Sequence, residues 1–507
     1  MAAVSHVPVL IVGAGPTGLT AAAELSRLGV GVRIVDRAPH PSAESKALAV
    51  QARTLELLRV RGVGEEMMLL GNRVGAASLH AGGRGLARVE LNRMPSAYNF
   101  ILMLAQSETE RLLAEQLGGQ GVKVERGVDV TMVRNEPAGQ SVSATLRHTG
   151  GEEERVEAQY LIAADGPHST IRKALGVSFR GRTLPHDYVL ADLHIAAAVP
   201  ESIPEDQVSI FLATNGFVAV FPMGHGRFRM MATDPAGVLG RADTPTVEQM
   251  QLLFDRTAGV PARLHGLRWS SQFRINSRSV PNLKAGRVFF GGDAAHVHSP
   301  AGGQGMNLGI QDMVNLSWKL AMVLDGRARP ELLDTYSSER LPVIRKVLRF
   351  TEFGTRVFNS TNPVVHALRI RMAPRALARD AVQNAAASMF GQLSADYRGD
   401  TLAEGAGGLD AARPGGRVPD VNSRYDALDL AGLTLFAGPG TADVVDVARQ
   451  WVGVVSVRDG QAHGEEGWVL VRPDGYLAAA GGPGDGAALD RWLRRWFVPG
   501  RLVGGSN

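Results

Sequence analysis

Glycines and an acid with the spacing of a nucleotide site occur near the start of the chain. The segment VLIVGAGPTGLT is an apolar run followed by Gly13, Gly15 and Gly18 in the pattern GxGxxG. In such a turn the first glycine permits the bend, the second lets a pyrophosphate approach the backbone, and the third lets the following helix pack on the strand. Asp36 ends the next apolar run, at the separation where a carboxylate accepts hydrogen bonds from ribose hydroxyls. These residues predict a dinucleotide site.

Two further acids follow apolar runs in the same way. QYLIAADG contains Asp165 and is followed by Ser169 and Arg172, and RVFFGGD ends in Asp293. After Asp293 the glycine-rich segment GGQGMN leads into the helical pattern LGIQDMVNLSWKLAMVL. The first N-H groups of such a helix supply positive potential that suits an anionic ligand. The pattern is compatible with two nucleotides in two domains or with one nucleotide held at both ends.

The elements that must position these acids have the pattern of an α/β fold. Each acid ends an apolar run of strand length, and a helical pattern follows Asp165 and Asp293, as in a doubly wound α/β domain. A similar turn, GGPGDGAALD at residues 481–490, is followed by too few residues for the next strand of a βαβ unit. We interpret that turn as an ordinary one.

The composition is that of a soluble globular protein with several structural units. The chain has 507 residues, of which 45% are hydrophobic and 21% charged, and this length exceeds what one core holds. The formal net charge of +4 is small and the charges are interspersed, which argues against nucleic-acid binding. The chain has no cysteine, which excludes disulfides, iron-sulfur ligation and thiol redox chemistry. The sequence has no signal-peptide pattern and no apolar run of membrane-spanning length, so we expect a cytoplasmic protein without membrane contact.

Two histidines in DAAHVHSP, His296 and His298, have the spacing of ligands on one face of a strand. Zinc sites need three or four ligands, and no third ligand cluster accompanies this pair in the sequence. We therefore predict no metal site.

The three acid-containing motifs together resemble those of the class A FAD-dependent aromatic monooxygenases of the para-hydroxybenzoate and phenol hydroxylase type. GxGxxG at Gly13 to Gly18, DGxxSxxR at Asp165 to Arg172, and GD at Gly292-Asp293 followed by GGQGMN match in order and spacing. The resemblance covers roughly residues 5 to 350 well and the tail more loosely. It is nearest to aromatic polyketide and phenol hydroxylases with a thioredoxin-like C-terminal domain. It implies one non-covalent FAD gripped from both ends.

The resemblance also implies roles for individual residues. Asp36 would hold the adenosine ribose, Asp165 would lie near the pyrophosphate and the approach of the nicotinamide cofactor, and Asp293 would bind the ribityl chain. The backbone of three residues at the start of the second glycine-rich helix would face the flavin ring, namely Gly305, Met306 and Asn307.

Four polar residues outside the motifs are further candidates for FAD contact. Arg37, beside Asp36, could stack on the nucleotide or pair with its charge, and the resemblance places Lys46 and Arg53 as cations near the flavin. The alternative for Lys46 and Arg53 is two solvated charges. Gln106 should also touch FAD, and a capping box of Ser107 and Glu110 would fix it at a strand-helix junction. The alternative for Gln106 is a polar residue that precedes a cap.

The implied activity is hydroxylation of a phenolic or polyketide-like aromatic through a flavin C4a-hydroperoxide, with FAD as cofactor and NADPH or NADH as transient reductant. The nicotinamide cofactor would visit transiently because a second GxGxxG in adequate context is missing. The substrate and O2 are the expected partners, and a homodimer is a further expectation. One alternative is oxygen insertion of the Baeyer-Villiger type on the same scaffold. Another is an FAD-containing protein that binds a ligand without turnover.

Residues 181–280 alternate apolar and polar side chains and predict an antiparallel sheet that roofs the substrate pocket. In the hydroxybenzoate enzymes the hairpin matching GFVAVFPMGHGRFRMM carries a serine and an arginine that clamp a carboxylate, whereas Phe221 and Met223 stand there in this chain. A small benzoate is therefore not the expected substrate. Arg274 could steady a phenolate, or lie on the solvent face of its strand. Pro300 is the candidate beside the reaction centre, where Ser299 replaces a second proline of the relatives.

The predicted fold class is α/β, with a Rossmann-like FAD domain of the GR2 type, an inserted antiparallel-sheet substrate domain and a thioredoxin-like C-terminal domain. The predicted boundaries are 1–180 and 281–400 for the FAD domain, 181–280 for the substrate domain, 401–420 for a linker and 421–507 for the C-terminal domain. Without cysteine, the C-terminal domain is expected to serve support or assembly.

Overall fold

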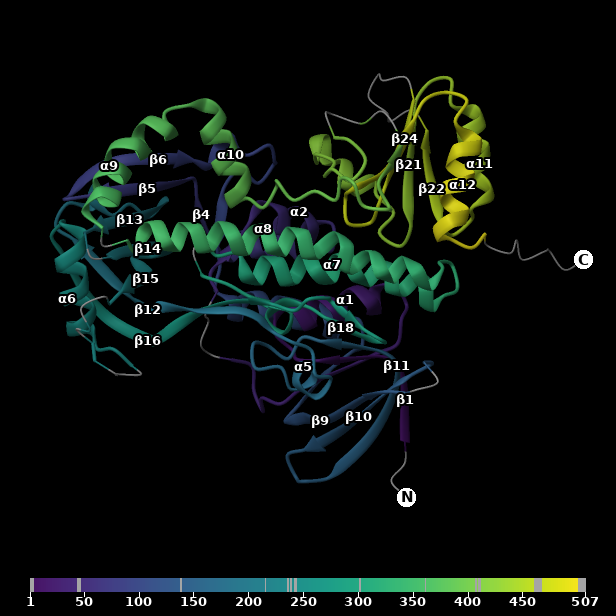
Figure 1. The fold of residues 1–507 in the computed structure, drawn as a ribbon, viewed down its shortest axis with the longest axis horizontal. Coiled ribbons are helices and arrows are strands. Elements are labelled where there is room, and N and C mark those ends of the chain that lie inside the picture. Colours follow the sequence, from purple (N-terminus) through teal and green to yellow (C-terminus); the bar gives the residue numbers. More distant parts are fainter. Residues whose placement is uncertain are drawn as a thin grey trace, which may run out of the picture.

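The chain folds into three lobes that meet along two long central helices (Figure 1). The structure, a computed structural model, describes residues 4–42, 47–136, 139–214, 216–234, 237, 239–240, 244–300, 302–360, 362–405, 408, 412–459 and 467–499. Lys46 lies outside these residues.

The first lobe is built on an eight-stranded sheet with a parallel centre. Its order is β17-β18-β11-β1-β2-β8, with β10 and β9 added beside β11. The strands are β1 Val4–Val12, β2 Val32–Asp36, β8 Val124–Arg126, β9 Val128–Asn135, β10 Val142–His148, β11 Glu153–Ala163, β17 Lys284–Ala285 and β18 Val288–Phe290. The parallel strands β8, β2, β1, β11 and β18 have the order of a doubly wound nucleotide fold. The predicted Rossmann-like domain is confirmed.

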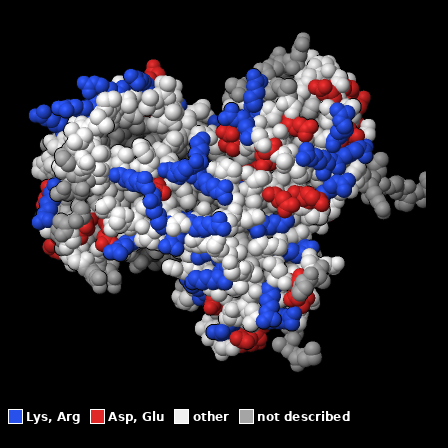
Figure 2. Space-filling model, in the orientation of Figure 1, with Lys and Arg blue, Asp and Glu red and all other residues white. Residues whose placement is uncertain are grey.

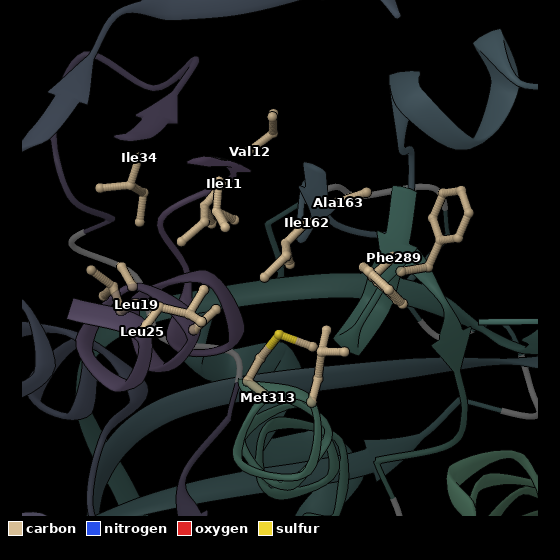
Figure 3. Close-up of a cluster of buried hydrophobic side chains, with 14 of the residues drawn as sticks. Ile11, Val12, Leu19, Leu25, Ile34, Ile162, Ala163, Phe289 and Met313 are labelled. Carbon is tan, nitrogen blue, oxygen red and sulfur yellow. The ribbon is translucent and has the colours of Figure 1, made fainter. Parts of the chain in front are cut away.

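The core of this lobe lies between the parallel sheet and two helices, α1 Pro16–Arg27 and α7 Gly305–Leu324. β1 is apolar on both faces, and its residues Val9 to Ile11 have no exposed surface, as expected for a central parallel strand. Figure 3 shows Leu19 of α1 and Met313 of α7 beneath Ile11 and Ile162 of the sheet. The same core therefore places the starts of α1 and α7 at one edge of the sheet.

Shorter elements complete the first lobe. The helices are α2 Ala52–Arg59, α3 Gly64–Leu70, α4 Gln106–Gly119 and α5 Thr170–Ala174, and a small sheet has the order β3-β7-β4, formed by Ala49–Val50, Ile101–Met103 and Asn72–Val74. The long helix α8 Thr335–Phe358 runs along α7 (Figure 1).

The second lobe is an eight-stranded sheet that is antiparallel except for one pair. Its order is β19-β16-β12-β15-β14-β13-β5-β6, and β13 and β5 are the parallel pair. The strands are β5 Ala76–Ala81, β6 Arg84–Glu90, β12 Arg180–Ala197, β13 Gln207–Ala213, β14 Gly216–Gly224, β15 Arg227–Thr233, β16 Ala262–Ser279 and β19 His296–Val297. The sheet therefore extends beyond the predicted range of 181–280, since β5 and β6 precede that range and β19 follows it.

Helices cover both faces of this second sheet. α6 Val247–Ala258 packs on one face, and its N-terminus is closed by a capping box of Thr246 and Gln249. α9 Pro363–Leu377 and α10 Asp380–Phe390 lie at the other side, next to β6. The edge strand β19 leads directly into the segment before α7, which joins the second sheet to the first lobe.

The third lobe is a five-stranded C-terminal sheet of order β20-β24-β23-β21-β22. Its elements are β20 Glu404–Gly405, β21 Leu433–Ala437, α11 Ala442–Gln450, β22 Val455–Asp459, β23 Trp468–Val471, β24 Leu477–Gly481 and α12 Gly486–Trp496. A parallel βαβ unit is followed by an antiparallel hairpin and a helix, as the thioredoxin-like interpretation requires. β20 belongs to the predicted linker but pairs with β24.

Surface charge is distributed over all three lobes. On the face shown in Figure 2, basic side chains lie across the middle of the molecule, and acidic side chains are more frequent on the C-terminal lobe. Among the described residues, no helix is long and apolar enough to cross a membrane.

Candidate functional site

The first glycine turn is closed by backbone contacts that only small residues allow. Gly13 has a φ of 103°, and its N-H donates to the Val35 carbonyl at 2.8 Å. A Cβ on Gly18 would overlap the Gly13 carbonyl oxygen, so α1 can approach β1 this closely only with glycine there. Asp36 accepts from Ala14 N at 2.6 Å. The turn and the predicted ribose acid are thus held together directly.

The second motif lies against the first. A Cβ on Gly13 would overlap the carbonyl oxygen of Ala164, the residue before Asp165. Asp165 accepts from the N-H of Thr170 at 2.8 Å, and Ser169 caps α5 by accepting from Arg172 N at 2.9 Å. Burial raises the pKa of Asp165, and its second carboxylate oxygen is enclosed without a hydrogen-bond partner among the described residues. The Asp165 carboxylate is therefore held by the start of α5 beside the first turn.

The third motif contacts both of the others. A Cβ on Gly292 or on Gly309 of α7 would overlap Thr17 of α1, so the second glycine turn packs on the first helix. Arg172 donates to the Ala294 carbonyl at 2.9 Å. Asp293, between Gly292 and Ala294, has an exposed side chain at this junction. The three motifs predicted from separate parts of the chain therefore lie in contact with one another.

The ends of α1 and α7 fit a ligand with negative charge. Neither helix has a side-chain cap at its N-terminus or an acidic residue in its first turn. In contrast, α6 is closed by its own capping box. Uncapped N-H groups of a helix N-terminus bind phosphate and other anions. The first turn thus suits a pyrophosphate, and the start of α7 suits an electron-rich ring.

The start of α7 keeps its side chains away from this edge. The Asn307 side chain is buried, where it accepts from Gln51 N at 2.9 Å and donates to the Ala49 carbonyl at 2.8 Å. Met306 is 8% exposed, and Gly305 has no side chain. This geometry fits the prediction that residues 305–307 offer backbone groups to a flavin.

Arg53 is the clearest departure from the predicted cofactor contacts. Its side chain has no exposed surface, and its guanidinium donates to Glu56 at 2.9 Å, to the Tyr425 hydroxyl at 2.7 Å and to the Asp474 carbonyl. Tyr425 and Asp474 belong to the C-terminal lobe. The geometry does not agree with a flavin contact, because a guanidinium enclosed between two lobes has no surface left for a ligand.

Gln106 lies at the predicted strand-helix junction, but the predicted capping box is wrong. α4 begins at Gln106 itself, with Ala105 as N-cap and no side-chain cap. Glu110 instead accepts from the Gln106 amide at 2.8 Å, and Gln106 accepts from Ala47 N at 3.2 Å. The half-buried Gln106 therefore joins the loop before β3 to α4, near the first turn.

Two further candidates face solvent. Arg274 has a side chain that is 63% exposed and pairs with Asp187 at 2.8 Å, while its neighbour Ile275 takes the buried face of β16. The prediction that Arg274 steadies a phenolate does not agree with this position, since strand alternation points it outward. Arg37 is also exposed, next to the half-buried Asp36.

The predicted pocket residues lie on an apolar face of the second sheet. Phe221 and Met223 are half-buried and pack in a cluster with Leu48 and Ala49, and Ala49 lies against Gly303 of the second glycine turn. Phe221 also joins an adjacent aromatic cluster on β12, β14, β16 and the end of α8, which contains Tyr188, Phe217, Phe273 and Phe358. This face suits a planar aromatic ligand.

The segment after β19 connects this aromatic face to α7. Pro300 is half-buried, and its carbonyl accepts from Gly303 N at 2.8 Å, which closes a turn. Ser299 accepts from the Thr355 hydroxyl of α8 at 2.8 Å, and His298 Nδ1 donates to the Ser299 carbonyl at 2.7 Å. Burial lowers the pKa of His298 to about 4, so its ring is neutral at neutral pH.

His296 pairs with an acid of α7. Its Nε2 lies 2.7 Å from Asp312 Oδ2 on α7, and both side chains are buried. Among the described residues, no group of three or more His, Asp or Glu side chains could hold a metal ion.

Asp312 and its partners are functional candidates that sequence reasoning missed. Asp312 also accepts from Gly292 N at 3.2 Å and from Arg340 Nε at 2.8 Å, so it fixes the turn that carries Asp293. Burial alone would raise the pKa of Asp312, but Arg340 and His296 outweigh burial and lower it. A signal was available in the sequence, because Asp312, Asn315 and Lys319 share one face of a largely apolar helix.

Family models match most of the chain. A model described as FAD binding domain matches residues 6–351, and one described as aromatic-ring hydroxylase, C-terminal, matches residues 411–499.

Individual proteins match over nearly the whole length. The 6-methylpretetramide 4-monooxygenase of Streptomyces rimosus is 37% identical over 93% of this chain and 90% of its own. The solved structure of an anhydrotetracycline hydroxylase from Streptomyces rimosus superimposes with a TM-score of 0.80 at 30% identity, covering 98% of this chain and 100% of that one. An aromatic hydroxylase from angucycline biosynthesis gives a TM-score of 0.79 at 31% identity, covering 96% of this chain and 99% of that one.

Proposed function

The chain belongs to the FAD-dependent aromatic monooxygenases, and from this premise we propose that it hydroxylates a phenolic, polyketide-like aromatic. The observation that carries the proposal is the contact of the three motifs, in which Thr17 of α1 packs on Gly292 of the second turn and on Gly309 of α7. One dinucleotide can then reach from the first turn to the start of α7. FAD is the cofactor, and when bound it supplies the oxygen chemistry.

Residues of the chain hold the parts of FAD in this proposal. Gly13, Gly15 and Gly18 admit the pyrophosphate, Asp36 accepts from the adenosine ribose, and Asp293 accepts from the ribityl chain. The backbone at Gly305 to Asn307 faces the ring and supplies positive potential from the start of α7. Arg37, Gln106 and Asp165 lie at the border of the same site. Lys46 stays a candidate from the sequence.

The substrate class follows from the apolar lining and from the relatives. Phe221 and Met223 occupy the hairpin where hydroxybenzoate enzymes carry a carboxylate clamp, and Arg229 nearby is already paired with Asp192 at 2.7 and 2.8 Å. A carboxylate on the ring would therefore meet apolar side chains. The names of the similar proteins refer to 6-methylpretetramide and anhydrotetracycline, which favours a polyketide-like phenol for this chain as well.

Turnover under labelled oxygen tests the proposal. The FAD-loaded protein is supplied with NADPH or NADH and 18O2, together with a panel of phenolic polyketides that includes anhydrotetracycline. We expect aromatic-stimulated NAD(P)H oxidation and a product carrying one 18O as a hydroxyl. Oxygen inserted into a ring would favour the Baeyer-Villiger alternative. Bound FAD without stimulation by any member of the panel would favour a ligand-binding protein without turnover.

A transient nicotinamide cofactor, a cytoplasmic location and a homodimer are further parts of the proposal. The resemblance to the class A monooxygenases implies that the nicotinamide cofactor would approach near Asp165. Light scattering of the purified protein measures the oligomeric state, and a monomer at micromolar concentration would contradict the dimer.

A further inference from the structure

The turn that joins β23 to β24 is buried, although turns usually lie on the surface. Residues 472–475 read Arg-Pro-Asp-Gly, a sequence suited to a tight turn, and Gly475 N donates to the Arg472 carbonyl at 2.9 Å. Arg472 and Asp474 are each 2% exposed. The tip of this C-terminal hairpin is therefore inserted into the first lobe.

The inserted turn forms a charge network with the two central helices. Arg472 pairs through two nitrogens with Glu339 of α8, with one contact at 2.8 Å, and through two nitrogens with Asp474 at 2.6 and 2.9 Å. Lys319 of α7 donates to Glu339 at 2.7 Å, and Asn315 donates to both carboxylates, at 2.7 and 3.2 Å. Two cations thus balance two carboxylates in a buried cluster.

The backbone of the turn is bound as well. Arg61 donates to the Pro473 carbonyl at 3.1 Å, and Arg53 donates to the Asp474 carbonyl. Buried carbonyls and charges are costly unless they are paired. This turn is therefore held in one position by α2, the residues after it, α7 and α8.

The same part of α8 also holds the second glycine turn. Arg340, adjacent to Glu339, donates to Asp312 at 2.8 Å and to the Leu308 carbonyl in the first turns of α7 at 3.3 Å. Asp312 in turn accepts from Gly292 N, next to Asp293. Arg340 also donates to the Tyr397 hydroxyl at 3.2 Å, and the Tyr397 ring lies 4.1 Å from that of Tyr476, just after the inserted turn.

We propose that Arg472 is a positioning residue for FAD, which acts through Glu339 and Arg340 on the turn that carries Asp293 and on the start of α7. The C-terminal lobe would then have a function in the reaction without touching the cofactor. The inference rests on the proposed function, because it takes the start of α7 and Asp293 as the flavin end of the site. Coupling between separate parts of a protein commonly changes an affinity by about 5- to 150-fold.

The test compares two cations that link the first lobe and the C-terminal lobe. Arg472→Met removes the proposed positioning contact. Arg59→Met is the matched control, because Arg59 of α2 binds Asp420 at 3.0 Å and Asp426 at 2.6 Å, and neither of these partners belongs to α7 or α8. FAD affinity is measured by calorimetry on the full-length proteins, and the flavin midpoint potential by equilibrium reduction of the holoproteins.

We expect Arg472→Met to bind FAD about tenfold more weakly than the wild type, and its flavin midpoint potential to differ from that of the wild type. We expect Arg59→Met to keep the FAD affinity and the midpoint potential of the wild type. Arg472→Lys keeps the positive charge but loses the bidentate pairing with the two carboxylates. Its FAD affinity should therefore lie between those of the wild type and Arg472→Met. If Arg472→Met does not fold, this lysine variant carries the test. Unchanged affinity and potential in the Arg472 variants, or equal changes in Arg59→Met, would overturn the inference. Failure of the wild type to bind FAD would instead contradict the proposed function.

Discussion

The two glycine turns that face the proposed FAD site are held in place by different means. The first, Gly13 to Gly18, is fixed by backbone contacts with Ala164 and by Asp36, all within the parallel sheet and its first helix. The second, Gly291 to Asn307, is fixed by buried charges, with Asp312 binding Gly292 N and Arg340 binding Asp312. Those charges lead through α8 to Arg472 of the C-terminal lobe.

The first turn is therefore fixed by residues close to it, whereas the second is fixed by residues from several parts of the fold. At the first turn, small residues and one acid are enough to fix the backbone, because a strand, a turn and a helix already meet there. The second turn follows a short strand and precedes a helix shared by all three lobes, so distant residues decide its position. The first turn should therefore be sensitive to side-chain volume, and the second to the loss of charge.

The largest combined effect, on stability and on FAD binding, is expected for Gly18→Ala. The new Cβ would overlap the Gly13 carbonyl oxygen, which belongs to the backbone of the tight turn and cannot swing aside as a flexible side chain would. We expect a loss of about 3 kcal/mol in the free energy of unfolding and loss of FAD binding. Gly118→Ala in α4 is the control, since nothing lies within 4 Å of its Cβ position. Urea unfolding and FAD titration measure both, and a Gly18→Ala protein as stable as wild type would refute the close contact.

A charge change should break the support of the second turn. Glu339→Gln leaves Arg472 and Lys319 without their shared carboxylate in a buried site. We expect the free energy of unfolding to fall by about 3 kcal/mol at pH 7, since an unpaired buried charge is costly. Glu108→Gln, which removes an exposed partner of Arg111, is the control and should leave stability near wild type. Equal effects of the two changes would argue against a buried network.

The loss of stability in Glu339→Gln should depend on pH, which tests the buried charges that support the second turn. Burial alone would raise the pKa of Glu339, but Arg472 and Lys319 outweigh it and hold the pKa at about 2, below the ordinary value of 4.5. The stabilisation from this carboxylate is therefore complete above about pH 5 and is lost as the pH falls toward 2. The stability difference between wild type and Glu339→Gln should shrink over this range. A difference that stays constant down to pH 3 would contradict the depressed pKa.

The smallest effect on FAD binding, stability and turnover is expected for a substitution outside both turns. Arg274→Ala removes an exposed ion pair with Asp187 on the solvent side of β16. FAD affinity, melting temperature and aromatic-stimulated NAD(P)H oxidation should all remain near wild type. A selective loss of turnover would return Arg274 to the list of catalytic candidates.

The sequence predicts the first turn better than the second because its determinants are adjacent. Gly13, Gly18 and Asp36 fall in one strand-helix-strand segment, so their spacing alone indicates the geometry. The second sheet was predicted in part, since β5 and β6 pair with it from a distant part of the chain. Long-range pairing of this kind leaves no local pattern.

Arg53 shows why the charged residues were harder to assign. The family resemblance implied a flavin contact for Arg53, yet Tyr425 and Asp474, more than 370 residues later, enclose its guanidinium. The buried partners of a charge depend on the packing of whole lobes. Asp312, Asn315 and Lys319 gave a weak local signal as polar residues on one face of a largely apolar helix.

The central claim is that one FAD is held by both turns, and calorimetric titration of FAD into the apoprotein tests it most directly. The wild type should bind one FAD per chain. Asp293→Ala removes the proposed ribityl acceptor of the second turn and leaves the first turn intact, so we expect FAD to bind at least about tenfold more weakly, as for the loss of a hydrogen bond to a charged group. Equal affinity of wild type and Asp293→Ala, or no FAD binding by the wild type, would contradict the two-ended grip.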